Sequence, residues 1–180
     1  HVKRRRQRQM CIRDRYSDRF EKIVAANTGL PTGKAPLSEG FAVFREFLQI
    51  KPDLHVAGQV RNGTTKGIDE NALAAYNAPF PDDDHKQGVR QFPNLVPGTP
   101  RTPSAEPNKE AWKILREWEK PFLCAFSDKD PIFSGVENSF YKLIPGCKDM
   151  PHVTIENAGH FLQEDQPNAC VEAILSIKDI

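Results

Sequence analysis

The 180-residue sequence contains no apolar run that approaches the ~20 residues a membrane-spanning helix requires. It also lacks a Cys-x-x-Cys pair, and its four cysteines are scattered along the chain, at Cys11, Cys124, Cys147 and Cys170. Such spacing indicates neither a zinc site nor a disulfide framework. We therefore expect a protein without a membrane span or a metal centre, in a reducing compartment that we predict to be the cytoplasm.

The composition is that of a loop-rich globular domain. Apolar residues make up 38% of the chain, which can supply one hydrophobic core, and the length fits a single domain. Fifteen prolines favour frequent turns and irregular segments between the regular elements.

Residues 1–15 differ from the rest of the chain because they are strongly basic. They contain seven Lys or Arg and one acid, and without them the chain carries a formal charge of −5. A basic arm can bind the phosphates of nucleic acids or anionic membranes, and this one lacks the apolar region of a secretory signal. Its letters also resemble the conceptual translation of sequencing-adapter DNA. We interpret the tail as such an artefact, and expect neither a nucleic-acid nor a membrane partner.

A histidine lies between a predicted strand and a predicted helix near the end of the chain. Residues 151–156 alternate apolar and polar positions, and the segment after Pro167 has the spacing of an amphipathic helix. Between them stands His160, beside Gly159, where a side chain is well placed for proton transfer at a sheet edge. The alternative is a loop histidine without a function.

Two carboxylates follow the preceding strand. Residues 120–127 form a mostly apolar run, as in a buried strand of a parallel sheet, and the run ends in Asp128 and Asp130. A carboxylate after one strand and a histidine after the next have the order in which an acid orients a base. Either aspartate could instead form a turn, since Asp before Pro is common turn chemistry.

These motifs resemble the haloalkane dehalogenase group of α/β-hydrolases. The resemblance rests on residues 120–132 and 158–165, and extends upstream through residues 74–82 and 90–93, and through residues 18–20 and 26–33. It covers nearly everything from about Ser17 to the end of the chain. In that family the segment similar to residues 18–20 follows a nucleophile elbow that carries an aspartate and a halide-binding tryptophan.

No such elbow occurs in this sequence: neither Gly-x-Asp-Trp-Gly nor Gly-x-Ser-x-Gly is present. The resemblance therefore implies the α/β class, as the C-terminal part of an α/β-hydrolase fold with a helical cap inserted in a mainly parallel sheet. We place the first surviving core strand in residues 16–34, the cap in 35–108 and the C-terminal core, with acid and base, in 109–180. We expect the isolated chain to be inactive and to fold poorly, because its sheet would have an exposed apolar edge.

The predicted cap contains three helices, which begin at Ser38, at Asp69 and at Asp83 or Asp84, followed by a Pro- and Gly-rich linker over residues 93–107. Phe41 and Phe44 lie on the apolar face of the first helix. The resemblance implies that they bind substrate; the alternative is that they only pack. In relatives the position similar to Phe44 holds a tryptophan whose N–H binds the leaving halide, a donor that phenylalanine lacks.

The resemblance implies a two-step reaction. An aspartate displaces halide from carbon to give an alkyl ester, and a histidine-activated water then hydrolyses that ester. Here His160 fits the base and Asp130 the carboxylate that stabilises it, with Asp128 as the fallback. The partners would be a small apolar, halogenated substrate and water, with no metal or organic cofactor. The full-length enzyme is expected to be a monomer.

Two other functions remain open from the sequence. An epoxide hydrolase uses the same aspartate and histidine chemistry but usually needs cap tyrosines, and Tyr76 is the only tyrosine in the predicted cap. A non-catalytic fragment that binds nucleic acid through its basic arm is the other possibility. Three further histidines (His55, His85 and His152) stand alone, without ligand spacing, and are predicted to be surface or loop residues.

Overall fold

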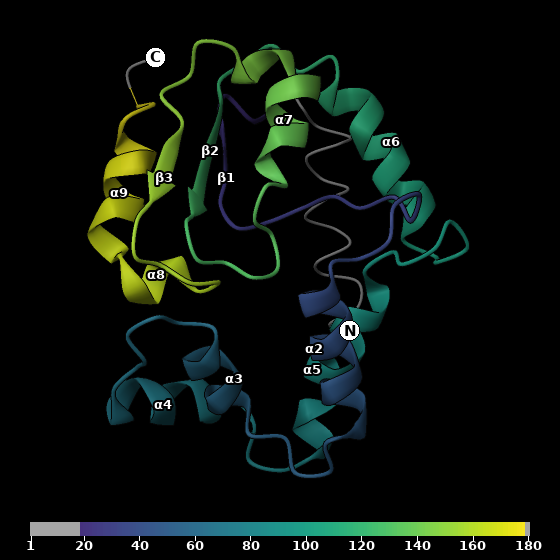
Figure 1. Ribbon diagram of the computed structural model, residues 1–180, viewed down its shortest axis with the longest axis vertical. Helices are drawn as coiled ribbons and strands as arrows, with labels where there is room; N and C mark the ends of the chain where they lie inside the picture. The colour runs from purple at the N-terminus through teal and green to yellow at the C-terminus, as the bar shows by residue number, and fades with distance from the viewer. Residues whose placement is uncertain (1–18, 179–180) are drawn as a thin grey trace.

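The computed structural model describes residues 19–178, which form a small parallel sheet with helices on both faces and a separate helical layer beyond one edge (Figure 1). The basic tail of residues 1–15 and the residues up to position 18 lie outside the described part. The predicted boundaries at 34 and 108 remain predictions, although helices fill most of the segment between them.

The sheet has three parallel strands in the order β1-β2-β3, with bounds Ile23–Ala25, Phe122–Ser127 and Val153–Ile155. In register, Ile23 pairs with Phe122 and Ala125 pairs with Val153. All three strands were expected: β2 from an apolar run, β3 from alternating apolar and polar residues, and β1 from the resemblance within residues 16–34. Each strand is shorter than the predicted segment. Because the strands are parallel, their carboxyl ends lie at the same edge of the sheet.

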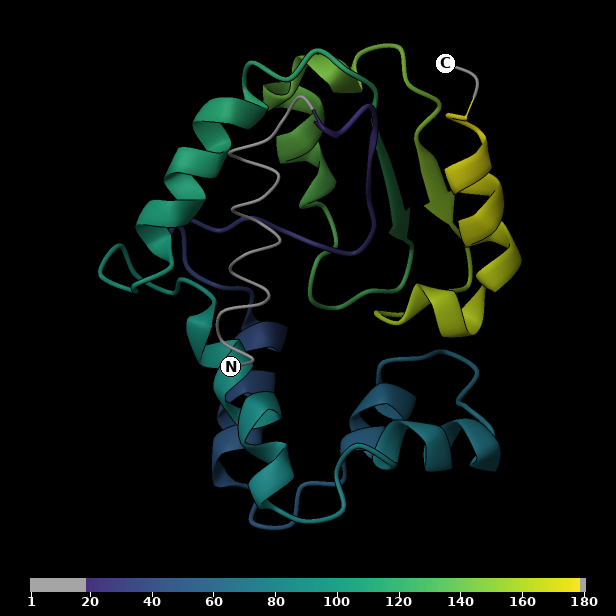
Figure 2. The same ribbon diagram turned by 180° about the vertical axis from the view of Figure 1, so that it is seen from behind.

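Strand β2 is buried on both faces, and its residues alternate between two hydrophobic clusters. Phe122, Cys124 and Phe126 pack with helices α6 (Ala105–Leu115) and α7 (Glu137–Leu143). The intervening residues pack with helix α9 (Pro167–Leu175) on the opposite face. The period of two along a strand thus produces a three-layer arrangement, in which α9 lies on one side of the sheet and α6 and α7 on the other (Figure 2).

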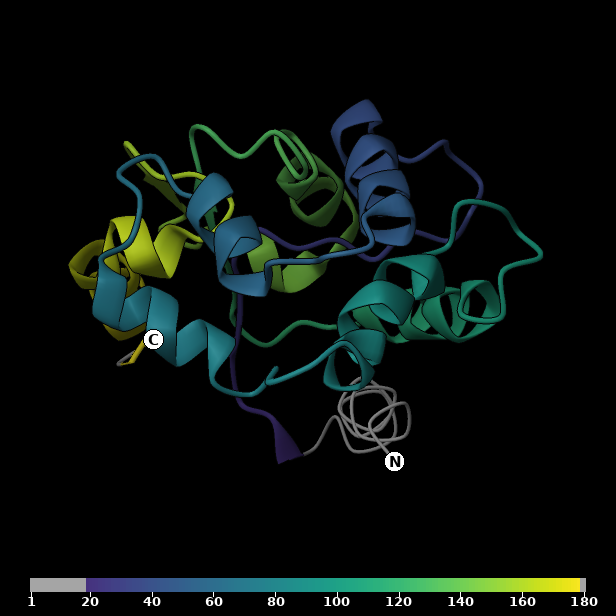
Figure 3. The same cartoon turned by 90° about the horizontal axis from the view of Figure 1, so that it is seen from below.

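The helical layer beyond the carboxyl edge of the strands contains four α-helices. Its bounds are α2 Glu39–Ile50, α3 Val56–Asn62, α4 Glu70–Asn77 and α5 Gln87–Gln91. Helices α3 and α4 form one pair beneath α8 (Leu162–Asp165), and α2 and α5 form another (Figures 1 and 3). We refer to this layer as the cap.

Capping side chains begin two cap helices where the sequence predicted them. The Ser38 hydroxyl accepts the Phe41 N–H at the start of α2, and the Asp69 carboxylate accepts the Ala72 N–H at the start of α4. The third predicted helix is also present, as a short 3-10 helix (Asp84–Lys86) that leads into α5.

Two features of the cap differ from the prediction. Helix α3 was not expected; the His55 imidazole caps it by accepting the Gly58 N–H, so this histidine has a structural role. The linker over residues 93–107 was wrong in its extent, because a 3-10 helix occupies Phe92–Leu95 and α6 already begins at Ala105. Pro107 lies in the first turn of α6, where its missing N–H costs no hydrogen bond.

Within residues 19–178 no helix combines the length and the apolar character that crossing a bilayer would demand.

Candidate active site

The residues that follow the three strands meet at the carboxyl edge of the sheet. Asn27 comes two residues after β1, Asp128 and Asp130 come directly after β2, and His160 follows β3. The loop after β2 is tied to the loop after β3 by backbone hydrogen bonds, including Lys129 N–H to the Ala158 carbonyl at 3.1 Å. Asn27 is tied to the same loop, because its Nδ2 lies 2.9 Å from the Gly159 carbonyl oxygen, so segments about 130 residues apart in sequence form one polar cluster.

Asp130 and His160 are in direct contact. The Asp130 Oδ2 atom lies 3.1 Å from Nδ1 of His160, and the aspartate side chain is fully buried whereas 25% of the histidine side chain is exposed. The other carboxylate oxygen accepts the backbone N–H of Ile132 at 2.8 Å. With both oxygens engaged, the carboxylate is fixed and directs Nδ1–H of the imidazole toward itself.

Aromatic rings hold the imidazole on two sides. The Phe133 ring stacks on it with a centroid distance of 5.7 Å, and the Phe161 ring meets it edge-on at 5.0 Å. Among residues 19–178, no group forms a hydrogen bond to Nε2 of His160. An imidazole with Nδ1 held by a carboxylate and Nε2 left as an acceptor can take a proton from water or from a hydroxyl group.

Asp128, the predicted fallback, faces a different group. Its Oδ1 atom accepts the Ala158 N–H at 3.1 Å, and the hydrogen bonds from the Asn157 and Ala158 backbone hold the pKa of this carboxyl below its usual value. Asp128 thus shapes the turn before His160, as Asp residues often do. The structure brings Asp130, and not Asp128, to the imidazole.

Asn27 was not singled out from the sequence, yet its buried side chain joins all three strand ends. Its Oδ1 accepts the Ser127 N–H at 2.9 Å. Its Nδ2 lies within hydrogen-bonding distance of the Ser127 hydroxyl and of the Gly159 and His160 carbonyls, at 2.7 to 3.0 Å. Asn27 has a φ of 35°, a left-handed conformation that asparagine tolerates better than most residues.

Asp165 is a second buried carboxylate that the sequence did not single out. It is 3% exposed and accepts the Gly159 N–H at 2.8 Å, as well as the backbone N–H groups of Thr65 and Lys66. Burial raises the pKa of this carboxyl, but the N–H donors of Gly159, Thr65 and Lys66 outweigh burial and lower the pKa overall. The only sign of this role in the sequence was that Asp165 is an acidic residue in the first turn of α8, the helix that follows His160.

The two phenylalanines predicted to bind substrate both lie on α2 and point to different surroundings. Their ring centroids are 6.4 Å apart. Phe41 is buried. Its neighbour Gly40 lies where α2 approaches the Pro131 carbonyl, in the loop after β2 that carries Asp130. Phe44 is half-buried and packs with Leu48.

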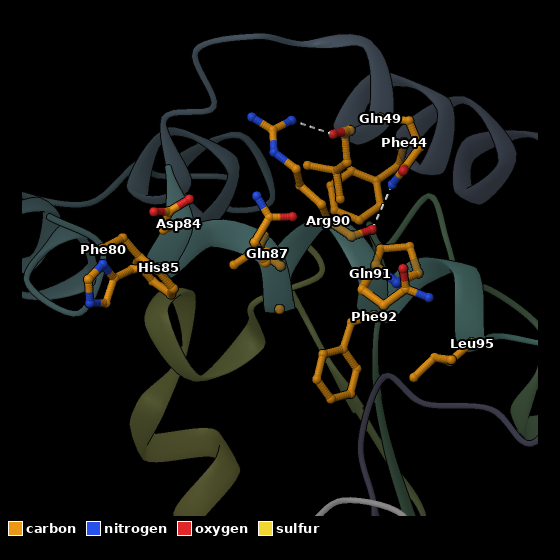
Figure 4. A pocket seen from close by; sticks show the side chains of 14 residues that line it. Phe44, Gln49, Phe80, Asp84, His85, Gln87, Arg90, Gln91, Phe92 and Leu95 are labelled. Carbon is orange, nitrogen blue, oxygen red and sulfur yellow. Dashed lines mark hydrogen bonds between the residues drawn. The ribbon is translucent and has the colours of Figure 1, made fainter. Parts of the chain in front are cut away.

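Phe44 also lines a pocket of about 950 Å³ between α2 and α5 (Figure 4). In this view, Phe80 and His85 lie on the left, and Phe92 and Leu95 lie toward the right. Neither Phe41 nor the Asp130–His160 pair is among the lining residues. The structure therefore places Phe44 at a cavity, and buries Phe41 on the same helix outside the residues that line that cavity.

His152 lies in the loop before β3, as predicted, and also has a structural role. Its Nδ1 accepts the Cys124 N–H at 3.0 Å, and its Nε2 lies 2.9 Å from the Cys147 carbonyl. The Tyr141 ring packs against the imidazole, with a centroid distance of 4.4 Å. Both ring nitrogens are occupied, so this half-buried histidine satisfies backbone groups beside β2.

No three His, Cys, Asp or Glu side chains among the described residues are grouped so that they could hold a metal ion.

The chain is similar to known haloalkane dehalogenases. A haloalkane dehalogenase of Psychrobacter cryohalolentis is 50% identical over 149 residues, which cover 83% of this chain and 49% of that protein. One of Mycolicibacterium paratuberculosis is 40% identical over 159 residues, covering 88% and 52%. The chain spans about half the length of the curated relatives it matches, and no family model matches it.

Solved structures show the same relationship. The tetrameric haloalkane dehalogenase DpaA of Paraglaciecola agarilytica superposes with a TM-score of 0.82 at 28% identity, over 96% of this chain and 56% of that one. A haloalkane dehalogenase reconstructed as an ancestor, AncHLD2, superposes with a TM-score of 0.75 at 19% identity, over 94% and 64%. The predicted resemblance to haloalkane dehalogenases and the predicted α/β-hydrolase fold are therefore confirmed.

Proposed function

We propose that this chain, related to haloalkane dehalogenases over about half of their length, supplies the acid, the base and the cap of an enzyme that cleaves carbon–halogen bonds. His160 is the general base and Asp130 the carboxylate that orients it. The observation that carries the proposal is the contact between Asp130 Oδ2 and His160 Nδ1 at 3.1 Å.

The proposed base acts in the second half of the reaction. In the first half, a carboxylate nucleophile outside this chain attacks the carbon that bears the halogen, forms an alkyl ester and releases halide. In the second half, His160 Nε2 takes a proton from a water molecule, whose oxygen attacks the ester carbonyl. Collapse of the tetrahedral intermediate releases an alcohol, which takes up the proton, and regenerates the carboxylate. The buried Asp130 stabilises the imidazolium in between.

The cap supports an apolar substrate. The pocket between α2 and α5 is lined by the rings of Phe44, Phe80 and Phe92 and by aliphatic side chains, together with polar and charged side chains such as Gln49 and Arg90. The apolar part of this lining suits a small haloalkane, whose only polar feature is the carbon–halogen bond. Phe44 offers no hydrogen bond to a departing halide, so we propose that the donor comes from the part of the enzyme that precedes this segment.

A fusion protein tests this function. The part of the Psychrobacter relative that precedes the matched segment is joined to residues 17–180 and incubated with 1-bromobutane. We expect bromide and 1-butanol in equal amounts, and none from either part alone. A folded fusion protein that releases no bromide would overturn the proposal.

Epoxide hydrolysis is the second candidate, and one contact disfavours it. The Tyr76 hydroxyl, the only tyrosine hydroxyl in the cap, donates to Glu164 Oε1 at 2.6 Å. This hydrogen bond raises the pKa of Tyr76 and commits its proton to a neighbouring carboxylate rather than to a substrate oxygen. Faster turnover of an epoxide than of a bromoalkane by the fusion protein would reverse this ranking.

We also propose a compartment and an oligomeric state for the complete enzyme. The free thiols of Cys124 and Cys147 are buried and suit a reducing compartment such as the cytoplasm. A monomer remains our expectation for the complete enzyme; DpaA, which is tetrameric, shows that a different assembly occurs in a similar structure. Size-exclusion chromatography with light scattering on the fusion protein distinguishes the two.

A further inference from the structure

We propose that Asp165 is a positioning residue for His160. Its hydrogen bonds hold the loop after β3, which carries His160, against residues 63–66 of the cap. These four residues form the turn after α3, and we call them the cap turn. The inference rests on the proposed function, because it assigns to Asp165 a part in the step that His160 performs.

The Asp165 carboxylate is the centre of this connection. Its two oxygens accept N–H groups from both partners: Gly159, the neighbour of His160, at 2.8 Å, and Thr65 and Lys66 of the cap turn at 2.9 to 3.1 Å. The side chain is 3% exposed, so these hydrogen bonds are shielded from water. Charge-assisted bonds of this kind are roughly twice as strong as neutral ones.

Further hydrogen bonds hold the cap turn on both sides of His160. The Phe161 N–H donates to the Gly63 carbonyl at 3.1 Å, and the Thr65 hydroxyl donates to the Asn157 carbonyl at 2.8 Å. The Lys66 ammonium donates to the Asp165 carbonyl at 2.8 Å. The loop that carries His160 is therefore fixed by the cap at positions before and after the histidine.

The contact leaves no room for side chains at two glycines. A Cβ atom on Gly63 would lie 2.6 Å from the Phe161 ring, and one on Gly159 would lie 2.5 Å from the Gly63 carbonyl oxygen. Since Phe161 donates its N–H to the Gly63 carbonyl and its ring meets the His160 imidazole edge-on, a displaced cap turn would change how that ring packs on the imidazole. The cap thus sets the position of the base as well as covering the site.

The predicted consequence is confined to one half-reaction. Formation of the alkyl ester requires the nucleophile and the substrate, whereas its hydrolysis requires His160 Nε2 to reach a water molecule. A misplaced imidazole should slow hydrolysis and leave halide release in the first turnover intact. A purely structural role for Asp165 would instead lower both steps together.

Two substitutions in the fusion protein test this inference, one on each side of the contact. Asp165→Asn replaces an acceptor oxygen by an N–H donor that faces other N–H donors. Gly63→Ala adds the clashing methyl group on the cap side, at a φ of −90°, where alanine is unstrained. Glu164→Gln alters a neighbouring cap contact that does not involve the His160 backbone, and Asn62→Ala changes an exposed side chain directly before Gly63; these are the matched controls.

Rapid mixing with 1-bromobutane separates the two half-reactions. For Asp165→Asn and for Gly63→Ala we expect an initial burst of one bromide per active site, followed by steady turnover reduced at least tenfold. Both controls should stay within twofold of the parent. Either test variant with turnover within twofold of the parent, or with burst and turnover lowered in parallel, would overturn the inference. Absence of bromide release from the parent would overturn the proposed function instead.

Discussion

The carboxylate of Asp130 is fully buried and touches the imidazole of His160, although the two residues are 30 positions apart. The Ile132 N–H occupies one oxygen, and His160 Nδ1 occupies the other. A buried carboxylate with both oxygens engaged has little freedom to rotate, so it fixes both the tautomer and the direction of the imidazole ring.

Replacing Asp130 by asparagine should impair turnover far more than stability. The amide retains the shape but cannot compensate an imidazolium, and it can hold the ring in the wrong tautomer. We expect turnover of the fusion protein to fall by about 10²–10⁴-fold. Steady-state bromide release measures the loss.

Asp128→Asn is the matched control, because Asp128 accepts a backbone N–H and does not contact His160. Its turnover should stay within about threefold of the parent. Equal losses in the two variants would contradict the assignment of Asp130.

Asn27→Asp should destabilise the strand ends. The substitution preserves the acceptor for the Ser127 N–H, but it directs an oxygen at the Gly159 and His160 carbonyls, where Nδ2 now donates. We expect a loss of about 2–4 kcal/mol in the free energy of unfolding at pH 7, measured by urea denaturation.

The same exchange at Asn138 serves as the control, because that side chain is exposed and donates only to the Gly135 carbonyl. Its effect should be under about 0.5 kcal/mol. If both variants unfold at the same urea concentration, the proposed role of Asn27 in joining the strand ends is wrong.

Asp165 should make stability depend on pH in the acid range. Its pKa is lowered in the folded state, so its contribution is complete above the unfolded pKa of about 4 and is lost as the pH falls through the lower, folded pKa. At pH 7 the parent fusion protein should be about 2 kcal/mol more stable than Asp165→Asn. Urea denaturation from pH 7 down to pH 3 should show the two converging; a constant difference would contradict the assignment.

Phe44→Trp should strengthen halide binding. The residue lines the cap pocket, and an indole N–H would add the hydrogen-bond donor that phenylalanine lacks. We expect the inhibition constant for bromide to fall about fivefold, corresponding to a hydrogen bond worth about 1 kcal/mol. Phe47→Trp, on the same helix but not lining the pocket, should leave that constant unchanged.

Local sequence signals predicted most of the regular elements. An apolar run predicted β2, because a buried parallel strand needs apolar side chains on both faces. Alternation of apolar and polar residues predicted β3, and the family resemblance placed β1 within residues 16–34. Capping residues predicted where α2 and α4 begin, since Ser38 and Asp69 satisfy N–H groups within three residues of themselves. Helix α3 was not predicted, because it is only seven residues long and its capping residue is a histidine.

The polar contacts of the site were only partly predictable. The contact between Asp130 and His160 followed from the order of strands and loops. The roles of Asn27 and Asp165 did not, because their partners lie about 100 or more residues away, at Ser127 and at Thr65. His152 lies in the loop before β3, as predicted, but its hydrogen bonds to the Cys124 N–H and the Cys147 carbonyl were not predicted, because nothing in the local sequence indicates these partners.

The most direct test of the central claim is a single-turnover measurement on the His160→Gln fusion protein. If His160 is the base that hydrolyses the ester, the variant should release one bromide per active site and then stop. Mass spectrometry should find the butyl group attached to the protein. Continued release of bromide at the parental rate, with no attached butyl group, would contradict the role of His160.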